Sequence, residues 1–338
     1  MFLYIVAAIV AFGVLILIHE LGHFTLAKLN DVMVEEFSIG MGPKLFGIKK
    51  GETLYAIRLF PIGGYVKMLG DEEASNDPRA FNNKSSLRRL SIVAAGPIMN
   101  LILAVLLYCI VGSASGVILP QVNQVLKNSP AEKVGIQKGD ELLKVNGSSV
   151  LTWDDFAIYV ALAKNKPVQI SVKHNGNIEN FTVKPMYDNA EKRYLIGISP
   201  SFIAHPNIIQ SVSNGFKQTI TMINEVYLSF KMLFSGEASA NDIGGPVTII
   251  KMTGSAAEAG LIPLLSFTAF LSTQLGILNL IPFPALDGGF VFLYLFQIIS
   301  GKKVDDNKVG LVNTIGFTIL MALMVVVVLK DIFYPVNF

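Results

Sequence analysis

Four apolar stretches stand out along this chain, separated by segments in which apolar and polar residues alternate over short distances. A helix needs about 20 residues to cross a hydrocarbon core of roughly 30 Å. The stretches near residues 2–24, 90–116, 262–284 and 311–330 reach that length. The pattern therefore predicts a polytopic α-helical membrane protein with about four transmembrane helices.

Composition agrees with a membrane protein, since 52% of the residues are hydrophobic, 15% are charged and the mean hydropathy is +0.53. The first stretch lacks the basic n-region and the cleavage site of a signal peptide, so we interpret it as a retained span. A net charge of +2, without a basic block interleaved with aromatic residues, argues against a nucleic-acid partner. The single cysteine, Cys109, excludes an intramolecular disulfide and a cysteine-rich zinc site.

The distribution of basic residues predicts the orientation in the membrane. Lys and Arg are frequent between the first two spans, and Lys302, Lys303 and Lys308 lie between the last two. By the positive-inside rule both loops are expected on the cytoplasmic side. The long segment after the second span is then extracytoplasmic, as are both termini, and the expected location is the bacterial inner (plasma) membrane.

The loop over residues 30–88 has strand-like segments at 37–43 and 54–60, bounded by glycine and proline. They predict a membrane-associated β-element on the cytoplasmic side. An exposed strand edge near the membrane could pair with an extended substrate. The alternative is a surface hairpin that only adds stability.

Residues 118–187 have the character of a soluble α+β domain. The segment 129–147, with Gly139-Asp140 and Val145-Asn146-Gly147, resembles a PDZ domain of the circularly permuted bacterial type. Such domains bind extended peptides or chain ends at a sheet edge. The alternative is a domain that only blocks access to the membrane site.

These features predict an order of four parts. Residues 1–116 form the first half of a membrane core, 117–190 the inserted extracytoplasmic PDZ domain, 191–260 a linker with an amphipathic helix, and 261–338 the second half of the core. The predicted linker helix covers residues 208–234, where apolar positions recur at helical spacing and suit the outer membrane surface.

The first span ends in the motif His19-Glu20-Leu21-Gly22-His23. On a helix, this spacing places both imidazoles on one face, where they can share a zinc ion while Glu20 addresses a water. A chance match on a core helix is the alternative, but an unpaired glutamate in a span is costly. The motif therefore predicts a zinc hydrolase that works inside the membrane.

A third ligand is expected from a carboxylate, because the remaining histidines, His174 and His205, fall in the outer segment and are expected at its surface. The first and third spans run in the same direction, so their ends lie at the same depth. Asp287 follows the end of the third span, after two prolines that break the helix. It is the predicted third ligand; the alternative is a residue that only flanks the span.

Taken together, several motifs resemble the site-2 protease family, in its RseP-type bacterial branch. They are His19-Glu20-x-x-His23, Phe60-Pro61-Ile62-Gly63-Gly64-Tyr65-Val66-Lys67-Met68, Ala95-Gly96-Pro97-x-x-Asn100 and Asn279-x-x-Pro282-x-Pro284-x-Leu286-Asp287-Gly288. The resemblance covers nearly the whole chain. It implies intramembrane zinc proteolysis of single-span proteins, with His19, His23 and Asp287 as Zn²⁺ ligands and Glu20 as the catalytic residue.

The same resemblance suggests substrate-binding residues. Asn279 is expected to contact substrate within a motif that includes Pro282 and Pro284, and Gly40 and Gly42 fall in the family's membrane-associated β-region. Asn100 could help to hold an extended substrate, or could only make an interhelical hydrogen bond. The best-known RseP has two PDZ domains, whereas this chain has room for one.

The mechanism expected from these residues is metal-assisted peptide hydrolysis. Zinc with three protein ligands has a fourth position to activate water, and Glu20 would accept the proton and pass it to the leaving amine. Two substrate classes remain open, pre-cleaved regulators such as anti-sigma factors and remnant signal peptides. A hypothesis from another class is a non-proteolytic scaffold that recruits partners through its PDZ domain.

Overall fold

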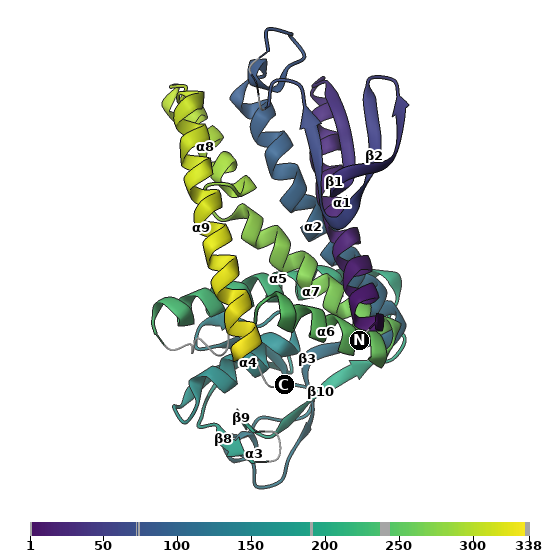
Figure 1. The fold of residues 1–338 in the computed structure, drawn as a ribbon. Coiled ribbons are helices and arrows are strands. Elements are labelled where there is room, and N and C mark those ends of the chain that lie inside the picture. Colours follow the sequence, from purple (N-terminus) through teal and green to yellow (C-terminus); the bar gives the residue numbers. More distant parts are fainter. Residues whose placement is uncertain (1, 72, 74, 190–191, 237–243, 335–338) are drawn as a thin grey trace. The chain divides into compact units, whose positions relative to one another are not determined.

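The computed structural model describes residues 2–71, 73, 75–189, 192–236 and 244–334 (Figure 1). The chain divides into two compact units. The first comprises residues 1–104 and 226–338, and the second comprises residues 105–225.

Among the described residues, four helices are long and apolar enough to cross a membrane. This confirms the four predicted membrane helices. They are α1 (Phe2–Leu29), α2 (Ser86–Ser115), α7 (Leu261–Leu280) and α9 (Asp306–Phe333).

The third membrane helix is shorter than predicted, because α7 ends at Leu280 rather than near residue 284. Ile281 precedes Pro282 and is extended, with φ −62° and ψ 134°, as expected for a residue before proline. A short helix that the sequence analysis did not predict, α8 (Asp287–Ser300), follows the proline segment. Its 14 residues extend about 21 Å, too little to cross the hydrocarbon core.

The predicted β-element is a long antiparallel hairpin of β1 (Val34–Lys50) and β2 (Thr53–Met68). It folds back on itself, because residues 34–39 pair with residues 64–68 and also with residues 54–57. The folded hairpin therefore has four strand segments, and residues 64–68 form one of its two edges. Gly40, Gly42 and Gly63 have positive φ at the bends, a conformation that glycine adopts without strain.

A buried apolar cluster joins this hairpin to the membrane helices. Val34, Phe37 and Val66 of the hairpin pack with Ile92 of α2 and Tyr294 of α8 in one core. The short 3₁₀ helix η1 (Phe81–Asn83) contributes to the same core before α2 begins. This packing fixes the edge of residues 64–68 beside the C-terminal half of α1.

The second unit contains a β-rich domain, residues 117–203, whose main sheet has the strand order β10-β3-β4-β6-β7. Its apolar core includes Leu142 and Ile170 of the sheet and Phe156 of a helix that packs on it. The strands are β3 (Val117–Val125), β4 (Glu141–Val145), β5 (Ser148–Ser149), β6 (Val168–His174), β7 (Asn177–Val183), β8 (Met186–Asp188), β9 (Arg193–Leu195) and β10 (Ile198–Ile203), with helices α3 (Pro130–Val134) and α4 (Trp153–Ala163).

This domain extends beyond the predicted boundary at residue 190. Strand β10 pairs with β3, the first strand of the domain, so the sheet is complete only when the chain reaches Ile203. The reason is the long sequence separation of the two strands, which a local pattern does not reveal.

Two more helices follow the domain, α5 (Ile208–Phe234) and α6 (Pro246–Ala259). Helix α5 agrees with the predicted helix over 208–234. Its buried Thr221 hydrogen-bonds to Asp155 and to Thr152 at the start of α4, both at 2.9 Å. The middle of α5 is thus bound to the β-rich domain rather than being a free linker.

His174 is not only a solvated surface residue. Its Nδ1 lies 2.5 Å from Oδ1 of the buried Asp140, which precedes β4. The other carboxylate oxygen of Asp140 accepts a hydrogen bond from the backbone N–H of Gln137. The hydrogen bond with Asp140 raises the pKa of His174 above its ordinary value.

We expect the stability of the β-rich domain to fall as the pH rises through the raised pKa of His174. The folded domain holds the proton more tightly than the unfolded chain, so the pair stabilises the fold below the ordinary histidine pKa, about 6.5. This contribution disappears above the folded pKa. Trp153, the single tryptophan, allows urea unfolding of the full-length protein to be followed in detergent between about pH 6 and 9.

In His174→Gln the decline of the urea midpoint over this pH range should disappear. His205→Gln is the matched control, because His205 is exposed and lies outside the sheet, and it should keep the wild-type decline. An unchanged decline in His174→Gln would show that the pair does not contribute.

Candidate metal centre

Both histidines of the first motif lie on one side of α1. They are four residues apart, and their Nε2 atoms are 3.2 Å apart. The rings are nearly perpendicular, with an interplanar angle of 80° and 4.8 Å between centroids. The helix therefore directs two nitrogen atoms toward one point, as the spacing predicts.

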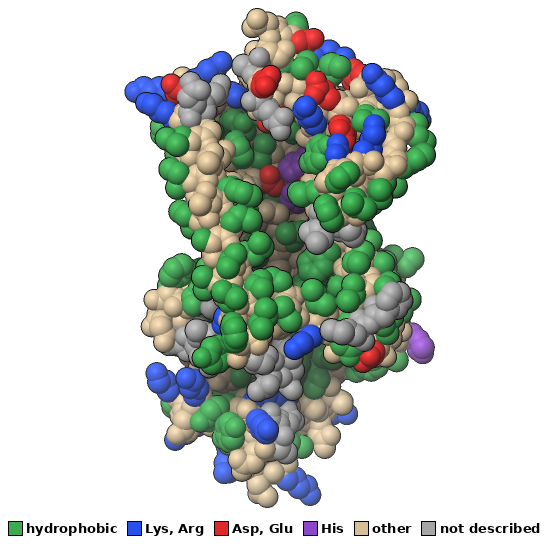
Figure 2. Space-filling view, in the orientation of Figure 1, with side chains coloured by type: hydrophobic (Ala, Val, Ile, Leu, Met, Phe, Trp, Pro, Cys, Tyr) green, Lys and Arg blue, Asp and Glu red, His purple; other side chains and the backbone are tan. Residues whose placement is uncertain are grey.

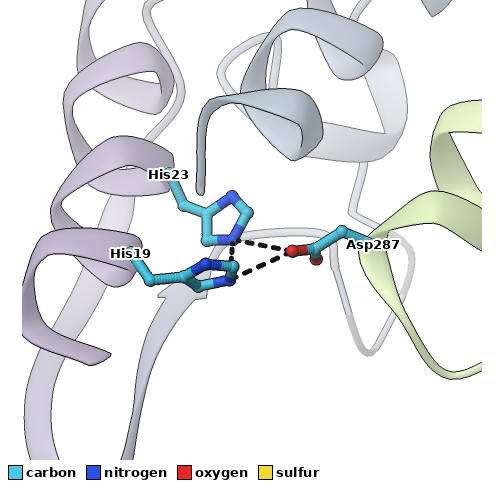
Figure 3. Close-up of side chains that lie close together, drawn as sticks. All are labelled: His19, His23 and Asp287. Carbon is cyan, nitrogen blue, oxygen red and sulfur yellow. Dashed lines mark hydrogen bonds and ion pairs between the residues drawn. The ribbon is translucent and has the colours of Figure 1, made fainter. Parts of the chain in front are cut away.

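Asp287 reaches the same point from the start of α8 (Figure 3). Its Oδ2 atom lies 3.0 Å from His19 Nε2 and 3.5 Å from His23 Nε2. The ligand atoms of these three residues all lie within 4.8 Å of one another. The predicted meeting of Asp287 with the two histidines is thus present in the structure.

The loop between α7 and α8 is tightly folded, and this conformation directs Asp287 toward the two histidines. The Phe283 N–H donates to the Ile281 carbonyl at 2.7 Å, and Ala285 has a positive φ of 74°. A Cβ atom at Gly288 would lie 2.1 Å from the Ile281 carbonyl oxygen, so only glycine fits after Asp287. Asn313 of α9 accepts a hydrogen bond from the Ala285 N–H at 3.3 Å.

Helix α2 contacts both histidines through residues at four-residue intervals. The Ile92 carbonyl oxygen lies 2.9 Å from His23 Nδ1, and Asn100 Nδ2 lies 3.1 Å from His19 Nδ1. Between them, a Cβ atom at Gly96 would lie 2.3 Å from His23 Nε2 and 2.8 Å from His19 Nε2. The absence of a side chain at Gly96 leaves space next to the ligand atoms.

The far end of α8 is also fixed to α2. The guanidinium of Arg89 stacks over the Tyr294 ring at 4.9 Å, and the Ser86 hydroxyl donates to the Gln297 side chain at 2.9 Å. Arg89, Tyr294 and Gln297 are all buried. These contacts hold the helix whose first residue is Asp287.

A cavity of about 250 Å³ opens at the three residues. Glu20 lines it, together with Tyr65 and Val66 from the hairpin edge. The other lining residues are His19, His23, Met68, Asp71, Phe81, Val93, Asp287, Phe290 and Tyr294. In the space-filling view, histidine and acidic side chains are visible inside a recess flanked by hydrophobic side chains (Figure 2).

Glu20 is close to the hairpin edge as well as to the histidines. A Cβ atom at Gly64 would lie 3.2 Å from Glu20 Cγ. Glu20 is thus close to the edge strand of residues 64–68.

The predicted substrate-binding residues lie in different places. Asn279 is half-buried in the last turn of α7, and Pro282 and Pro284 line a separate apolar cavity against α8 and α9. Gly40 and Gly42 pack on Phe60 at a bend of β1. None of these five lines the cavity of Glu20.

Asn100 is fully buried between helices and faces His19. This placement favours the interhelical hydrogen bond over the direct substrate contact that the sequence analysis also considered. The side-chain partner of Asn100 in this structure is His19 of α1.

Several residues of the site were not assigned a role from sequence. Gly96 was part of a motif, and its closeness to the histidines follows only from the packing of α2 on α1. Ile92 acts through its backbone carbonyl, which no side-chain pattern reveals. Asn313 could have been identified as a candidate, because it is an isolated asparagine in the fourth span and a polar group in a membrane span is energetically costly.

Comparison with known proteins agrees with this geometry. The profile of Peptidase family M50 matches residues 7–323. A relative in Clostridium acetobutylicum that is named as a zinc metalloprotease is 64% identical over 337 residues, covering 100% of this chain and 99% of the relative. The regulator of sigma-W protease RasP of Bacillus subtilis is 29% identical over 412 residues, covering 97% of this chain and 98% of the relative.

Solved structures similar to the chain include the PDZ domain of the SdrC-like protein Lin2157 from Listeria innocua. It is 26% identical, with a TM-score of 0.23, and the match covers 27% of this chain and 100% of that domain.

The family match covers almost the entire chain, its relatives are zinc metalloproteases by name, and four helices in the described part of the chain are long and apolar enough to cross a membrane. These findings set aside the hypothesis of a non-proteolytic scaffold. The chain belongs to Peptidase family M50, the site-2 protease family, and is an integral membrane zinc metalloprotease.

Proposed function

We propose that this protein is an intramembrane endopeptidase that cleaves transmembrane segments of single-span membrane proteins. The observation that supports it best is the meeting of His19, His23 and Asp287 beside Glu20, at the broken end of a membrane helix. A hydrolytic site inside a membrane suits a substrate whose scissile bond lies there too.

His19, His23 and Asp287 would hold the zinc ion. Two imidazoles and one carboxylate form the ligand set of a catalytic zinc site, in which a fourth position stays open. The space next to Gly96 and the convergence of the ligand atoms fit a small ion. Zinc supplies Lewis acidity, which polarises a peptide carbonyl and makes water a nucleophile near neutral pH.

Glu20 would be the general base and then the general acid. It lines the cavity with the three ligands, so its carboxylate can take a proton from water and return it to the leaving amine. The half-buried position of Glu20 limits competition from bulk water.

The hairpin edge of residues 64–68 would hold the substrate in an extended form. Tyr65, Val66 and Met68 of this edge line the cavity, and an edge strand offers backbone groups for pairing with an unwound segment. The substrate must unwind, because a helical amide is hydrogen-bonded and sterically shielded. Asn279 in the last turn of α7, and Pro282 and Pro284 after it, would bind substrate, and Gly40 and Gly42 would shape the hairpin.

We further propose that the substrate is a regulator such as an anti-sigma factor that another protease has already shortened. The name of the Bacillus subtilis relative, regulator of sigma-W protease, favours this class. Removal of remnant signal peptides is the second candidate, because it needs the same chemistry.

The β-rich domain is proposed to be a PDZ domain on the extracytoplasmic side. Its Gly139-Asp140 and Val145-Asn146-Gly147 segments support this. Strand β10 pairs with β3 on one side, and its other side could receive a peptide or a chain end. The basic residues near the hairpin and between α8 and α9 support a cytoplasmic position for the loops that carry them.

Glu20→Gln should retain zinc and lose cleavage, because the ligands stay while the proton acceptor is removed. We expect kcat/KM to fall by about 10²- to 10⁴-fold, while Asp287→Asn should lose the metal. The measurement is cleavage of a tagged single-span substrate in liposomes, with zinc content determined on each sample. Glu258→Gln, the same change at an exposed site bonded to Tyr4, is the control, and cleavage by Glu20→Gln at the wild-type rate would refute the assigned role.

Gly96→Ala should weaken zinc binding although it alters no ligand, because its Cβ would come within 2.8 Å of both Nε2 atoms. We expect zinc affinity to fall by at least about tenfold, as when other supporting groups are lost. Gly13→Ala on α1, with no atom within 4 Å of the added Cβ, should bind zinc like the wild type. Normal zinc affinity in Gly96→Ala would place the ion elsewhere.

A substrate that unwinds more easily should be cleaved faster. Each Leu→Gly change costs a helix about 1 kcal/mol, so two such changes at the scissile region should raise kcat/KM by up to about 30-fold. Two Leu→Ala changes, which preserve helix propensity, should have little effect. Equal rates for all three substrates would argue against unwinding as a determinant of cleavage.

A further inference from the structure

The two histidines have different partners at their second ring nitrogen. His23 Nδ1 lies 2.9 Å from the Ile92 carbonyl oxygen, and His19 Nδ1 lies 3.1 Å from the Asn100 side-chain amide. A neutral imidazole has one N–H donor and one acceptor nitrogen. The partner of Nδ1 therefore decides whether Nε2 is free to bind a metal.

For His23, the Ile92 backbone carbonyl determines which ring nitrogen carries the hydrogen. A carbonyl oxygen only accepts hydrogen bonds, so the Ile92 carbonyl selects the tautomer with the hydrogen on Nδ1. The lone pair is then on Nε2, which faces Asp287 and His19.

For His19 the partner is an amide, which can donate or accept. Asn100 is fully buried, and its Oδ1 has no hydrogen-bond partner among the described residues. A half turn about the last side-chain bond exchanges the amide oxygen and nitrogen. The unpaired oxygen would then face His19 Nδ1, where an acceptor is required if Nε2 is to bind the metal.

We propose that Asn100 is a positioning residue for His19, whose amide oxygen accepts a hydrogen bond from Nδ1–H and so leaves Nε2 free for zinc. The inference rests on the proposed function of His19 as a ligand. It assigns Asn100 a role in binding the metal rather than the substrate.

The surroundings of Asn100 fit such a role. The buried Ser272 hydroxyl of α7 donates to the Asn100 backbone carbonyl at 2.7 Å, rather than to the side-chain amide. Asn100 does not line the cavity of Glu20. A fully buried amide outside that cavity is well placed for a histidine and poorly placed for a peptide.

Zinc affinity, measured by chelator competition on the full-length protein in detergent, tests the proposal. Asn100→Leu, similar in size but without an acceptor, should bind zinc about 10- to 100-fold more weakly. Asn100→Asp, which retains an acceptor oxygen, should stay within about threefold of the wild type or bind more tightly. Ser272→Ala is the matched control, because it disturbs the same α2–α7 contact without touching the amide, and should leave the affinity unchanged.

A second measurement needs no variant. In the zinc-loaded wild type, ¹⁵N spectra of the four histidines should show two rings with a protonated Nδ1 and a metal-bound Nε2. One such ring instead of two would overturn the proposal.

Two further outcomes would also overturn it. Asn100→Leu with wild-type zinc affinity and a raised KM would make Asn100 a substrate contact, and equal weakening in Asn100→Leu and Asn100→Asp would make it a packing residue. Failure of the proposed function has a different signature, since Asp287→Asn would then bind zinc as well as the wild type does.

Discussion

The structure depends on the burial of a carboxylate against two imidazoles at membrane depth. A charged group in such a place is tolerated only with partners close by, and here Asp287 lies within hydrogen-bonding range of His19. Helices α1 and α8, which carry these groups, and α2, which contacts both rings, must therefore be held in a fixed arrangement. Close packing of α1 on α2 contributes, since a Cβ atom at Gly22 would lie 2.4 Å from the Ala95 carbonyl oxygen.

Small residues and backbone groups contribute much to this fixed arrangement of helices. Gly22, Gly96 and Gly288 each remove a side chain where another helix, a ring nitrogen or a carbonyl comes close. In a membrane, where lipid is as apolar as leucine, such close approach and interhelical hydrogen bonds replace the hydrophobic drive between helices. A glycine of the site thus acts by its lack of volume, whereas the ligands act by their chemistry.

The sequence allowed the parts with local signals to be predicted. Helical spacing predicted that His19 and His23 lie on one face, and apolar length predicted four membrane helices. The direction of the spans predicted that Asp287 lies at the same membrane depth as the two histidines. The parts that were missed depend on contacts between distant segments. Strand β10 joins the sheet of β3 across most of the domain, α8 exists because α7 ends early, and Asn100 finds its partner on another helix.

The early end of α7 has one more consequence. Because the chain breaks before Asp287 and resumes as a helix, this carboxylate is the first residue of α8. The aligned peptide dipoles of a helix place roughly half a positive charge at its N-terminus, which favours an anion there. The backbone of α8 therefore stabilises the negative charge of Asp287 independently of its side-chain partners, and a longer α7 that ran through residue 287 would present the opposite, negative end of a dipole to the same carboxylate.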